Sequence, residues 1–434
     1  MAAPLPPGRT GFPLLGETLA FMKDSFAFVA SRQAEHGPVF KTHLLGHPAA
    51  VIMGPEATRA FIDPERIQRE GSMPTNVQEL FAGPSLPMLD GGVHRARKQQ
   101  VLAAFTPEAL ASYLPAMQAH AEASLAAWAG QGEVAGVAAF KALALETIDD
   151  NFLGLEKGAA TAEMVARFDT FSSGFAALPV PLPGTQFHRT LRARDEILGA
   201  LREAVARHRA GRVEGTGLSR ILSARGEDGT SIDDAAAVLE IHHVQIAGYI
   251  VFAWMAAALV ALAETPERKK ELEAEVAAAP QALDAKALRA MPRLADFVRE
   301  VKRHTPVLSV SFGKAKRAFE LEGFTIPEGW MVLHGLRATN LWSGSFAAPE
   351  AFDPGRYARG EGRDEDVIYV PQGAGPRLGH KCAGTDYATL LLSVFLASTL
   401  RGFEFALPEQ DLGFEWKRIP PEPRSGLRVR FTAR

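Results

Sequence analysis

Cysteine is almost absent from this sequence: Cys382 is the only one among 434 residues. A lone thiol cannot form a disulfide within the chain, so internal cross-linking is excluded as a source of stability. The remaining roles for Cys382 are a reactive or metal-binding thiol, or an ordinary buried side chain in a turn. The residues around it must decide between these roles.

The chain also lacks an excess of charge of either sign. Its 47 Lys and Arg residues are balanced by 50 Asp and Glu residues, and the net charge is -3. This balance gives no reason to expect nucleic acid or an anionic membrane as a partner. No apolar stretch of about 20 residues opens the chain, and no signal-peptide pattern is visible. We therefore expect a soluble, cytoplasmic protein without a membrane anchor.

No Pro/Ser-rich linker and no run of like charges divides the chain, although its length allows two domains. We expect a single, mainly helical domain over residues 1–434. Hydrophobic residues make up 47% of the sequence, which is enough for a core that surrounds a cofactor.

The segment that ends near Cys382 is rich in glycine and proline. It reads Pro-Gln-Gly-Ala-Gly-Pro-Arg-Leu-Gly-His-Lys-Cys-Ala-Gly over residues 371–384, which predicts a loop whose backbone lies flat against something. An apolar helical pattern follows from Thr385 to Leu396. Free N–H groups and the dipole at the start of a helix stabilise a thiolate. A haem iron held by cysteine is the cofactor that best fits such a site.

This segment resembles the haem-binding loop of the cytochromes P-450, the haem-thiolate oxygenases. The general pattern of that family is not met, because Gly375, Leu378 and His380 replace its Phe, Gly and Arg. The present form is more similar to the bacterial fatty-acid peroxygenase and decarboxylase branch, which uses hydrogen peroxide. The resemblance implies one haem b group with Cys382 as the iron ligand. Other loop residues implied as haem contacts are Gln372, Gly373, His380, Lys381 and Gly384.

Two further segments resemble parts of the family that contact the haem propionates. Gln68-Arg69-Glu70-Gly71 resembles a peroxygenase segment, and the guanidinium of Arg69 suits a carboxylate partner. On the residues alone, an exposed Arg69 is an equal alternative. His94, Arg97 and Lys98 share one face of a helix, and the Asp-Gly-x-x-His-x-x-Arg run resembles the helix that grips the propionates. The alternative for this face is a solvated charged surface.

The most informative helix is expected from Asp233 to Ala263, and polar residues interrupt it too often for a membrane span. In the family the matching helix crosses the distal face of the haem. Oxygen-dependent members carry an acid followed by an alcohol there, and the peroxygenase branch carries Arg-Pro. One register puts Ile246 and Ala247 at these positions, and the other puts residues 250 and 251 there. Neither register supplies an acid, an alcohol or an arginine.

Proton delivery must then come from another group. His242 and His243 lie one turn before Ile246, and imidazole is a suitable acid-base group near neutral pH. Gln245 is a candidate for holding a water molecule. The alternatives are that the two histidines only pack and hydrogen-bond, or that the substrate brings its own acid. Pro87 stands where peroxygenases carry a polar residue, which predicts a drier pocket.

Three other features bear on the fold and the pocket. Glu300 and Arg303 resemble the Glu-x-x-Arg motif of the family, and Arg356 resembles the arginine that completes this cluster. Leu308 and Val310 are candidate pocket walls. The Pro-rich apolar segment 178–189 can cap a hydrophobic tunnel, and it is more similar to the loop of P-450s that act on retinoids or plant terpenoids.

The local patterns also predict individual elements. Ser25 is expected to cap a helix that ends near His36, and a hairpin is expected within residues 39–53. A helix and a loop should follow over residues 54–71, and several packed helices should lie between residues 110 and 171. Alternating residues over 307–336 predict strands.

These observations predict a mainly α cytochrome P-450 fold with a small β portion. The resemblance implies a bacterial haem-thiolate oxidoreductase in which thiolate donation promotes O–O cleavage to a ferryl species. We expect hydrogen peroxide to drive hydroxylation or oxidative decarboxylation of a hydrophobic, carboxylate-bearing substrate such as a fatty acid. The alternatives are a monooxygenase of a terpenoid, lipid or aromatic substrate with a ferredoxin-type partner, a thiolate-haem isomerase, and a haem-binding module without turnover.

Overall fold

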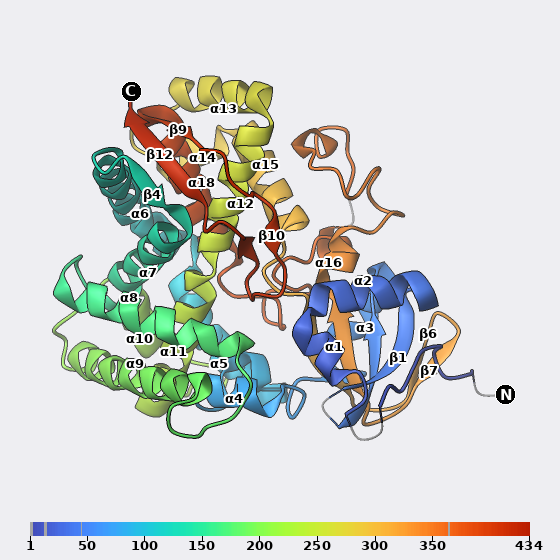
Figure 1. Cartoon of the computed structure of the whole chain (residues 1–434). Helices are drawn as coiled ribbons and strands as arrows, with labels where there is room; N and C mark the ends of the chain where they lie inside the picture. Colours follow the sequence, from blue (N-terminus) through green and yellow to red (C-terminus); the bar gives the residue numbers. More distant parts are fainter. Residues whose placement is uncertain (1–2, 13–14, 45, 363–364) are drawn as a thin grey trace.

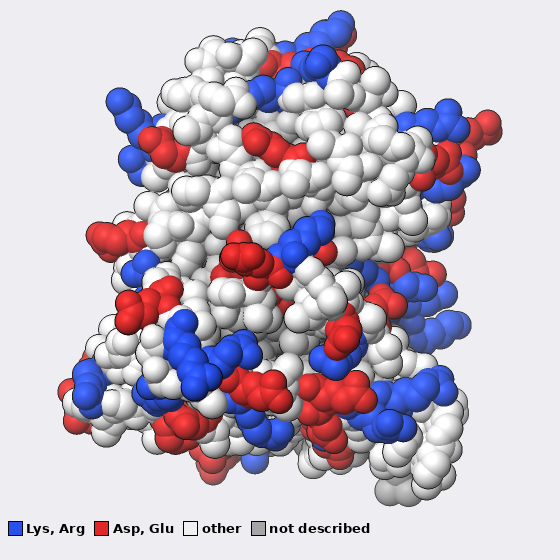
Figure 2. All heavy atoms as spheres, turned by 90° about the vertical axis from the view of Figure 1, so that its left-hand side faces the viewer, with Lys and Arg blue, Asp and Glu red and all other residues white. Residues whose placement is uncertain are grey.

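The computed structural model describes residues 3–12, 15–44, 46–362 and 365–434. These residues form a mainly helical body with a smaller β-rich part near the N-terminus, as the sequence predicted. Figure 1 shows the β-rich part at the lower right, the helices at the left and top, and α12 running through the middle. Figure 2 shows acidic and basic side chains interspersed over the helical face, which agrees with the small net charge.

A five-stranded sheet is the centre of the β-rich part, with strand order β1-β2-β8-β5-β3. Only the β2–β8 pair is parallel, and the β1–β2 pair is the hairpin expected within residues 39–53. The strands are β1 (Val39–Leu44), β2 (His47–Ile52), β3 (Ile67–Gln68), β5 (Val310–Ala315) and β8 (Met331–Gly335). The expected strands within 307–336 are therefore confirmed, together with an additional hairpin of β6 (Phe319–Leu321) and β7 (Phe324–Ile326).

Helix α2 (Ser25–His36) packs on this sheet and shows one error in the sequence prediction. Its N-cap is Asp24, whose side chain accepts a hydrogen bond from the N–H of Ala27 at 2.9 Å. Aspartate is as good an N-cap as serine, so the pattern alone did not separate the two. The Ser25 hydroxyl instead accepts a hydrogen bond from the Ser309 hydroxyl at 2.7 Å, which ties α2 to the chain before β5.

The helical body contains the helix series expected between residues 110 and 171 and continues well beyond it. Its helices are α4 (Thr75–Phe81), α5 (Gly91–Leu102), α6 (Pro107–Ala129), α7 (Gly136–Leu153), α8 (Ala159–Ser172), α9 (Gln186–Arg209), α10 (Gly217–Ser223), α11 (Asp234–Tyr249), α12 (Val251–Glu264), α13 (Pro266–Ala278), α14 (Ala285–Arg289), α15 (Pro292–His304) and α18 (Thr385–Gly402). The remaining short helices are α1 (Thr18–Lys23), α3 (Pro55–Ile62), α16 (Leu336–Asn340) and α17 (Glu365–Ile368). Small strands at the edges are β4 (Glu133–Ala135), β9 (Phe403–Ala406), β10 (Phe414–Glu415), β11 (Glu422–Pro423) and β12 (Arg428–Ala433).

The long central helix is divided in two at Ile250, where the prediction had one continuous helix. Asp233 caps its start by accepting from the N–H of Ala236 at 2.8 Å. Together α11 and α12 are apolar and long enough to cross a membrane, but 83% of the most apolar window is buried. This pair is therefore a core helix. Gly248 lets it approach α7, because a Cβ there would lie 1.5 Å from Cδ1 of Ile148.

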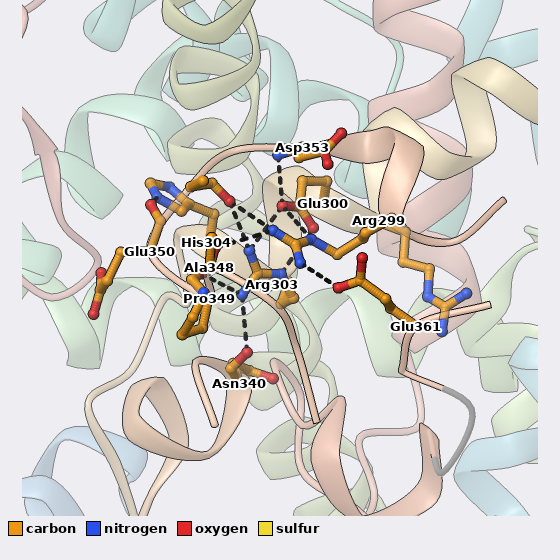
Figure 3. A network of polar contacts seen from close by, with 12 residues as sticks. Arg299, Glu300, Arg303, His304, Asn340, Ala348, Pro349, Glu350, Asp353 and Glu361 are labelled. Atoms are coloured by element: carbon orange, nitrogen blue, oxygen red, sulfur yellow. Dashed lines mark hydrogen bonds and ion pairs between the residues drawn. The ribbon is translucent and has the colours of Figure 1, made fainter. Parts of the chain in front are cut away.

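The predicted charge cluster is confirmed in the core. Arg303 donates to both carboxylate oxygens of Glu300 at 2.8 and 2.7 Å, and Arg356 Nε donates to Glu300 Oε1 at 3.1 Å. Arg303 also donates to the carbonyls of Asn340 and Pro349 at 3.1 and 2.8 Å, and Figure 3 shows these contacts converging on its guanidinium. Such a fully bonded buried cluster fixes the loop between α16 and α17, which precedes the Cys382 segment.

Candidate active site

The Cys382 segment is a loop followed by a helix, as the sequence predicted. The backbone N–H of Cys382 donates to the carbonyl of Gln372 at 3.1 Å, and Nε2 of Gln372 lies 3.7 Å from the sulfur. Gly373 and Gly375 have φ values of 79° and 95°, which side chains rarely allow. Helix α18 begins at Thr385, whose hydroxyl donates to the carbonyl of Cys382 at 2.9 Å. The thiol is thus partly exposed at the entrance of a helix.

A largely apolar cavity of about 420 Å³ opens between this loop, α11 and β5. Gly373, Ala374 and His380 line it on the side of the loop. Leu308 and Val310 line it as the sequence predicted, and so do Pro87 and Pro179. Further apolar walls are Phe61, Ile62, Met73, Val77, Phe81 and Phe175. The cavity can therefore hold a large hydrophobic group close to the thiol loop.

One face of α11 forms the distal wall of this cavity. His243, Ile246, Ala247 and Ile250 all line it, at the i, i+3, i+4 and i+7 spacing of a helix face. The structure thus brings three of the candidate catalytic residues together. The fourth lining residue, Ile250, is also the residue at which α11 and α12 are divided.

The other two candidates on α11 lie outside the cavity lining. Nε2 of His242 lies 3.0 Å from the carbonyl of Leu80, and burial lowers the pKa of His242 to about 4. Gln245 is fully buried and donates to Oδ1 of Asp149 at 2.6 Å. Burial raises the pKa of Asp149 to about 7, against the hydrogen bond from Gln245. Both residues therefore join α11 to its neighbouring helices.

Glu240 is a buried carboxylate behind His243 that sequence reasoning missed. Its Oε2 lies 3.6 Å from Nδ1 of His243, and its side chain is fully buried. Its Oε1 accepts from the N–H of Leu86 at 3.0 Å and from Arg97 at 3.2 Å. The Arg97 side chain is thus engaged by Glu240. The i, i+3 spacing of Glu240 and His243 was the available signal.

Arg69 is a buried cation on the opposite side of the cavity. Its Nη1 donates to the carbonyl of Phe312 at 2.6 Å, and its guanidinium lies 3.9 Å from the centre of the Phe61 ring. Burial lowers its pKa to about 10. In the described part of the chain, no carboxylate lies within ion-pair distance of it. The charge of Asp90, which accepts from the backbone N–H of Arg69 at 2.7 Å, opposes this lowering of the pKa. A guanidinium that lines the cavity without a direct ion pair suits an anion bound there.

His94 and His380 stack on one another beside Arg69, with ring centres 4.1 Å apart. Nε2 of His380 lies 3.4 Å from Oδ1 of Asp90, a second residue that sequence reasoning missed. Burial, with the charges of His380 and Lys98, lowers the pKa of His94 to about 3, so its imidazole is neutral. Nε2 of His94 is buried without a hydrogen-bond partner among the described residues. Such an atom needs a polar partner.

Lys98 lies beneath the thiol loop. Its side chain is 1% exposed, and Nζ donates to the carbonyl of Lys381. Burial lowers the pKa of Lys98 to about 8, while the charges of Cys382 and Glu240 oppose this change. Gly384 directly precedes α18, and a Cβ there would lie 3.5 Å from the Phe105 ring.

These residues fit a haem. The thiol of Cys382 suits the iron, and the apolar cavity suits the porphyrin. Arg69 and the unpartnered nitrogen of His94 suit the propionates. The fit uses side chains from α5, from the residue after β3 and from the loop before α18, which only the folded chain brings together.

Comparison with known proteins identifies the family. A family model described as Cytochrome P450 matches residues 6–417, so the chain belongs to the cytochrome P450 family. The chain is 29% identical to cytochrome P450 120 of Synechocystis sp. over 437 residues, covering 99% of this chain and 97% of that protein. It is 28% identical to abscisic acid 8'-hydroxylase 2 of Arabidopsis thaliana over 442 residues, covering 99% and 90%. The chain is a mainly helical P450 enzyme of the monooxygenase type, with haem as its cofactor.

The solved structures agree with this family. Retinoic acid bound cyanobacterial CYP120A1 has a TM-score of 0.91 at 28% identity, covering 100% of both chains. Cytochrome P450EX alpha (CYP152N1) with myristic acid has a TM-score of 0.83 at 21% identity over 100% of both chains, a likeness of fold alone. The expected likeness to the fatty-acid peroxygenase branch is thus found in the fold, whereas the sequence relatives named above are a cytochrome P450 120 and an abscisic acid hydroxylase.

Proposed function

We propose that this P450 hydroxylates an apolar isoprenoid carboxylic acid, using dioxygen and electrons from a ferredoxin-type partner. The observation that carries the proposal is the distal wall. Of the described residues, those of α11 that line the cavity are His243, Ile246 and Ala247, the C-cap residue Ile250 continues this wall, and none of the four is an arginine. A peroxygenase of fatty acids needs a cation there to hold the carboxylate over the haem. The wall instead presents hydrocarbon and one imidazole.

The similar proteins support the substrate class. Retinoic acid and abscisic acid, which two of their names contain, each combine an isoprenoid skeleton with a carboxylate. The cavity offers apolar walls for such a skeleton, and Lys417 stands at its exposed rim. We propose that Lys417 pairs with the substrate carboxylate, leaving the apolar end of the molecule toward Ala247.

In the bound enzyme the haem supplies the activation of oxygen and its insertion into a C–H bond. The side chains of the chain position the substrate and supply protons. We propose that Nδ1 of His243 faces Glu240 while Nε2 exchanges a proton with water in the cavity. Leu86 and Arg97 fix Glu240, so the imidazole has a defined orientation. The small side chain of Ala247 leaves room for a substrate C–H bond, and the apolar wall excludes bulk water.

The deciding experiment compares electron sources on one preparation of the enzyme. Retinoic acid, abscisic acid and palmitate are each incubated with NADPH, ferredoxin and ferredoxin reductase, or with hydrogen peroxide alone. We expect hydroxylation of an isoprenoid acid that requires NADPH and both redox proteins. Conversion of palmitate by peroxide alone, with no turnover in the reconstituted system, would contradict the proposal.

A cytoplasmic location remains part of the proposal, because the long apolar helix is a core helix.

A further inference from the structure

Lys302 is a buried lysine that neither the charge cluster nor the cavity uses. It lies on α15, two residues after Glu300 and directly before Arg303. Residues one or two positions apart on a helix do not share a face. Its side chain therefore points away from the cluster and into the core between α12 and α18, where it is 1% exposed. Lysine is almost never fully buried unless it is paired.

The ammonium of Lys302 is held in place by two neutral side chains. Nζ donates to the hydroxyl of Thr389 at 2.8 Å and lies 5.2 Å from the centre of the Trp254 ring. Trp254 is itself fixed, because its Nε1 donates to the carbonyl of Thr305 at 2.8 Å. Within the described ranges, no carboxylate lies within ion-pair distance of this nitrogen. Burying an ammonium without an anion costs several kcal/mol, so a negative charge should lie nearby.

The hydrogen bonds of Lys302 lead to Cys382. Thr389 donates to the carbonyl of Thr385 at 2.9 Å, and the hydroxyl of Thr385 donates to the carbonyl of Cys382 at 2.9 Å. The lysine is thus attached to the first turns of the helix that begins just after the thiol. Burial lowers the pKa of Lys302 to about 8, while the negative charges of Cys382 and Asp386 oppose this decrease. The side chain is therefore protonated at pH 7.

We propose that Lys302 is a positioning residue whose buried ammonium is, beside Lys98, a second counter-charge of the Cys382 thiolate and raises the reduction potential of the bound haem. Adding one electron to the iron makes the site more negative, and a fixed positive charge in a low-dielectric core favours that state. The proposal rests on haem held by Cys382. It does not depend on the substrate or the oxidant proposed above.

The test is the reduction potential of the haem-loaded enzyme, measured by spectroelectrochemistry without substrate. A unit charge roughly 10 Å away at an effective dielectric of about 20 changes an equilibrium constant by about tenfold. We therefore expect Lys302→Met to shift the ferric–ferrous equilibrium about tenfold toward ferric, which is about 59 mV for one electron. Lys302→Arg keeps the charge and should stay within about threefold of the wild type. A Lys302→Met potential that equals the wild-type value would overturn the proposal.

Two further variants separate the charge from packing. Lys141 is a half-buried lysine on α7 that pairs with Glu422 at 3.4 Å, so Lys141→Met removes a cation elsewhere and should leave the potential unchanged. An equal shift in this variant would show that the effect is not specific to Lys302. If Lys302→Met does not fold, Lys302→Gln decides the matter, because its amide can still donate to the Thr389 hydroxyl but carries no charge. Lys302→Gln should lower the potential as Lys302→Met does, and a potential equal to the wild-type value would overturn the proposal.

Discussion

Nδ1 of His243 lies 3.6 Å from Oε2 of Glu240, one helical turn earlier on the distal helix. The imidazole faces the cavity, whereas the carboxylate is fully buried and hydrogen-bonded from behind. A titratable side chain at the cavity is thus oriented by one that water does not reach. We propose that the two form a proton path, since the α11 residues that line the cavity include neither an acid nor an alcohol.

The first prediction concerns this pair. His243→Ala should lower kcat for the physiological reaction by about 100-fold, in the range of a lost general acid. Glu240→Gln should lower kcat less, because the imidazole remains. The measurement is product formed per NADPH consumed, since a failed proton delivery also releases reduced oxygen. His242→Ala is the matched comparison on the same helix and should lower the unfolding midpoint rather than kcat. An unchanged kcat in His243→Ala would mean that the His243 side chain contributes to packing and not to proton delivery.

A second prediction concerns the pH dependence of stability. The pKa of Asp149 is about 7 in the folded protein, whereas the ordinary value of an aspartate, expected in the unfolded chain, is 3.8. Between these values the folded state binds more protons than the unfolded state, so rising pH lowers the free energy of unfolding. The loss approaches about 4 kcal/mol above pH 7. Asp149→Asn keeps the bond from Gln245 and should abolish this loss.

The measurement is urea denaturation of the wild type and Asp149→Asn at pH 5 and pH 8. Buried histidines such as His94 change stability in the opposite direction, since their pKa values are lowered on folding. They contribute equally to both proteins, so the difference between the two isolates Asp149. A variant that is no more stable than the wild type at pH 8 would refute the assignment.

The third prediction tests the iron ligand. Cys382→Ala should abolish the red-shifted Soret band that the reduced carbon monoxide complex of a thiolate-bound haem shows, and turnover with it. Haem retention should fall but not vanish, because Arg69 and His380 still line the cavity. Gln372→Ala is a milder change that removes the N–H group 3.7 Å from the sulfur and should preserve the band. Pigment and turnover intact in Cys382→Ala would disprove the site.

The fourth prediction concerns recognition of the substrate. Lys417→Met should raise KM for an isoprenoid acid about tenfold while kcat changes little, because the lysine pairs with the carboxylate in substrate and transition state alike. The methyl ester of the same acid should show no such difference between the two enzymes. An equal increase in KM for acid and ester would mean that Lys417 contributes packing only.

The sequence predicted best what is local. The glycine loop and helix α18, the β1–β2 hairpin and the Glu300–Arg303 pair each follow from residues a few positions apart. The contact of Arg356 with Glu300 was also foreseen, but from family resemblance rather than from spacing. Local patterns cannot decide between two neighbouring residues that cap a helix about equally well, as with Asp24 and Ser25 at the start of α2.

The features that were missed depend on contacts between distant segments. The stack of His94 on His380 and the bond of Lys98 to Lys381 each join α5 to a loop far along the chain. The burial of Glu240 depends on Leu86 and Arg97, which no helical period reveals. The division at Ile250 has no proline to mark it. These positions are set by tertiary packing, so one sequence does not display them.

Gly248 determines how closely α11, which forms the distal wall, packs against α7 on the side away from the cavity. A single methyl group there would meet Ile148, so the separation of the two helices depends on a missing side chain rather than on one that is present. A larger residue at position 248 would move α11, and with it the distal wall, toward the cavity. A smaller residue in place of Ile148 would allow the distal wall to move back. The volume offered to a guest molecule can thus be tuned from the far side of the helix, by residues that never touch the guest.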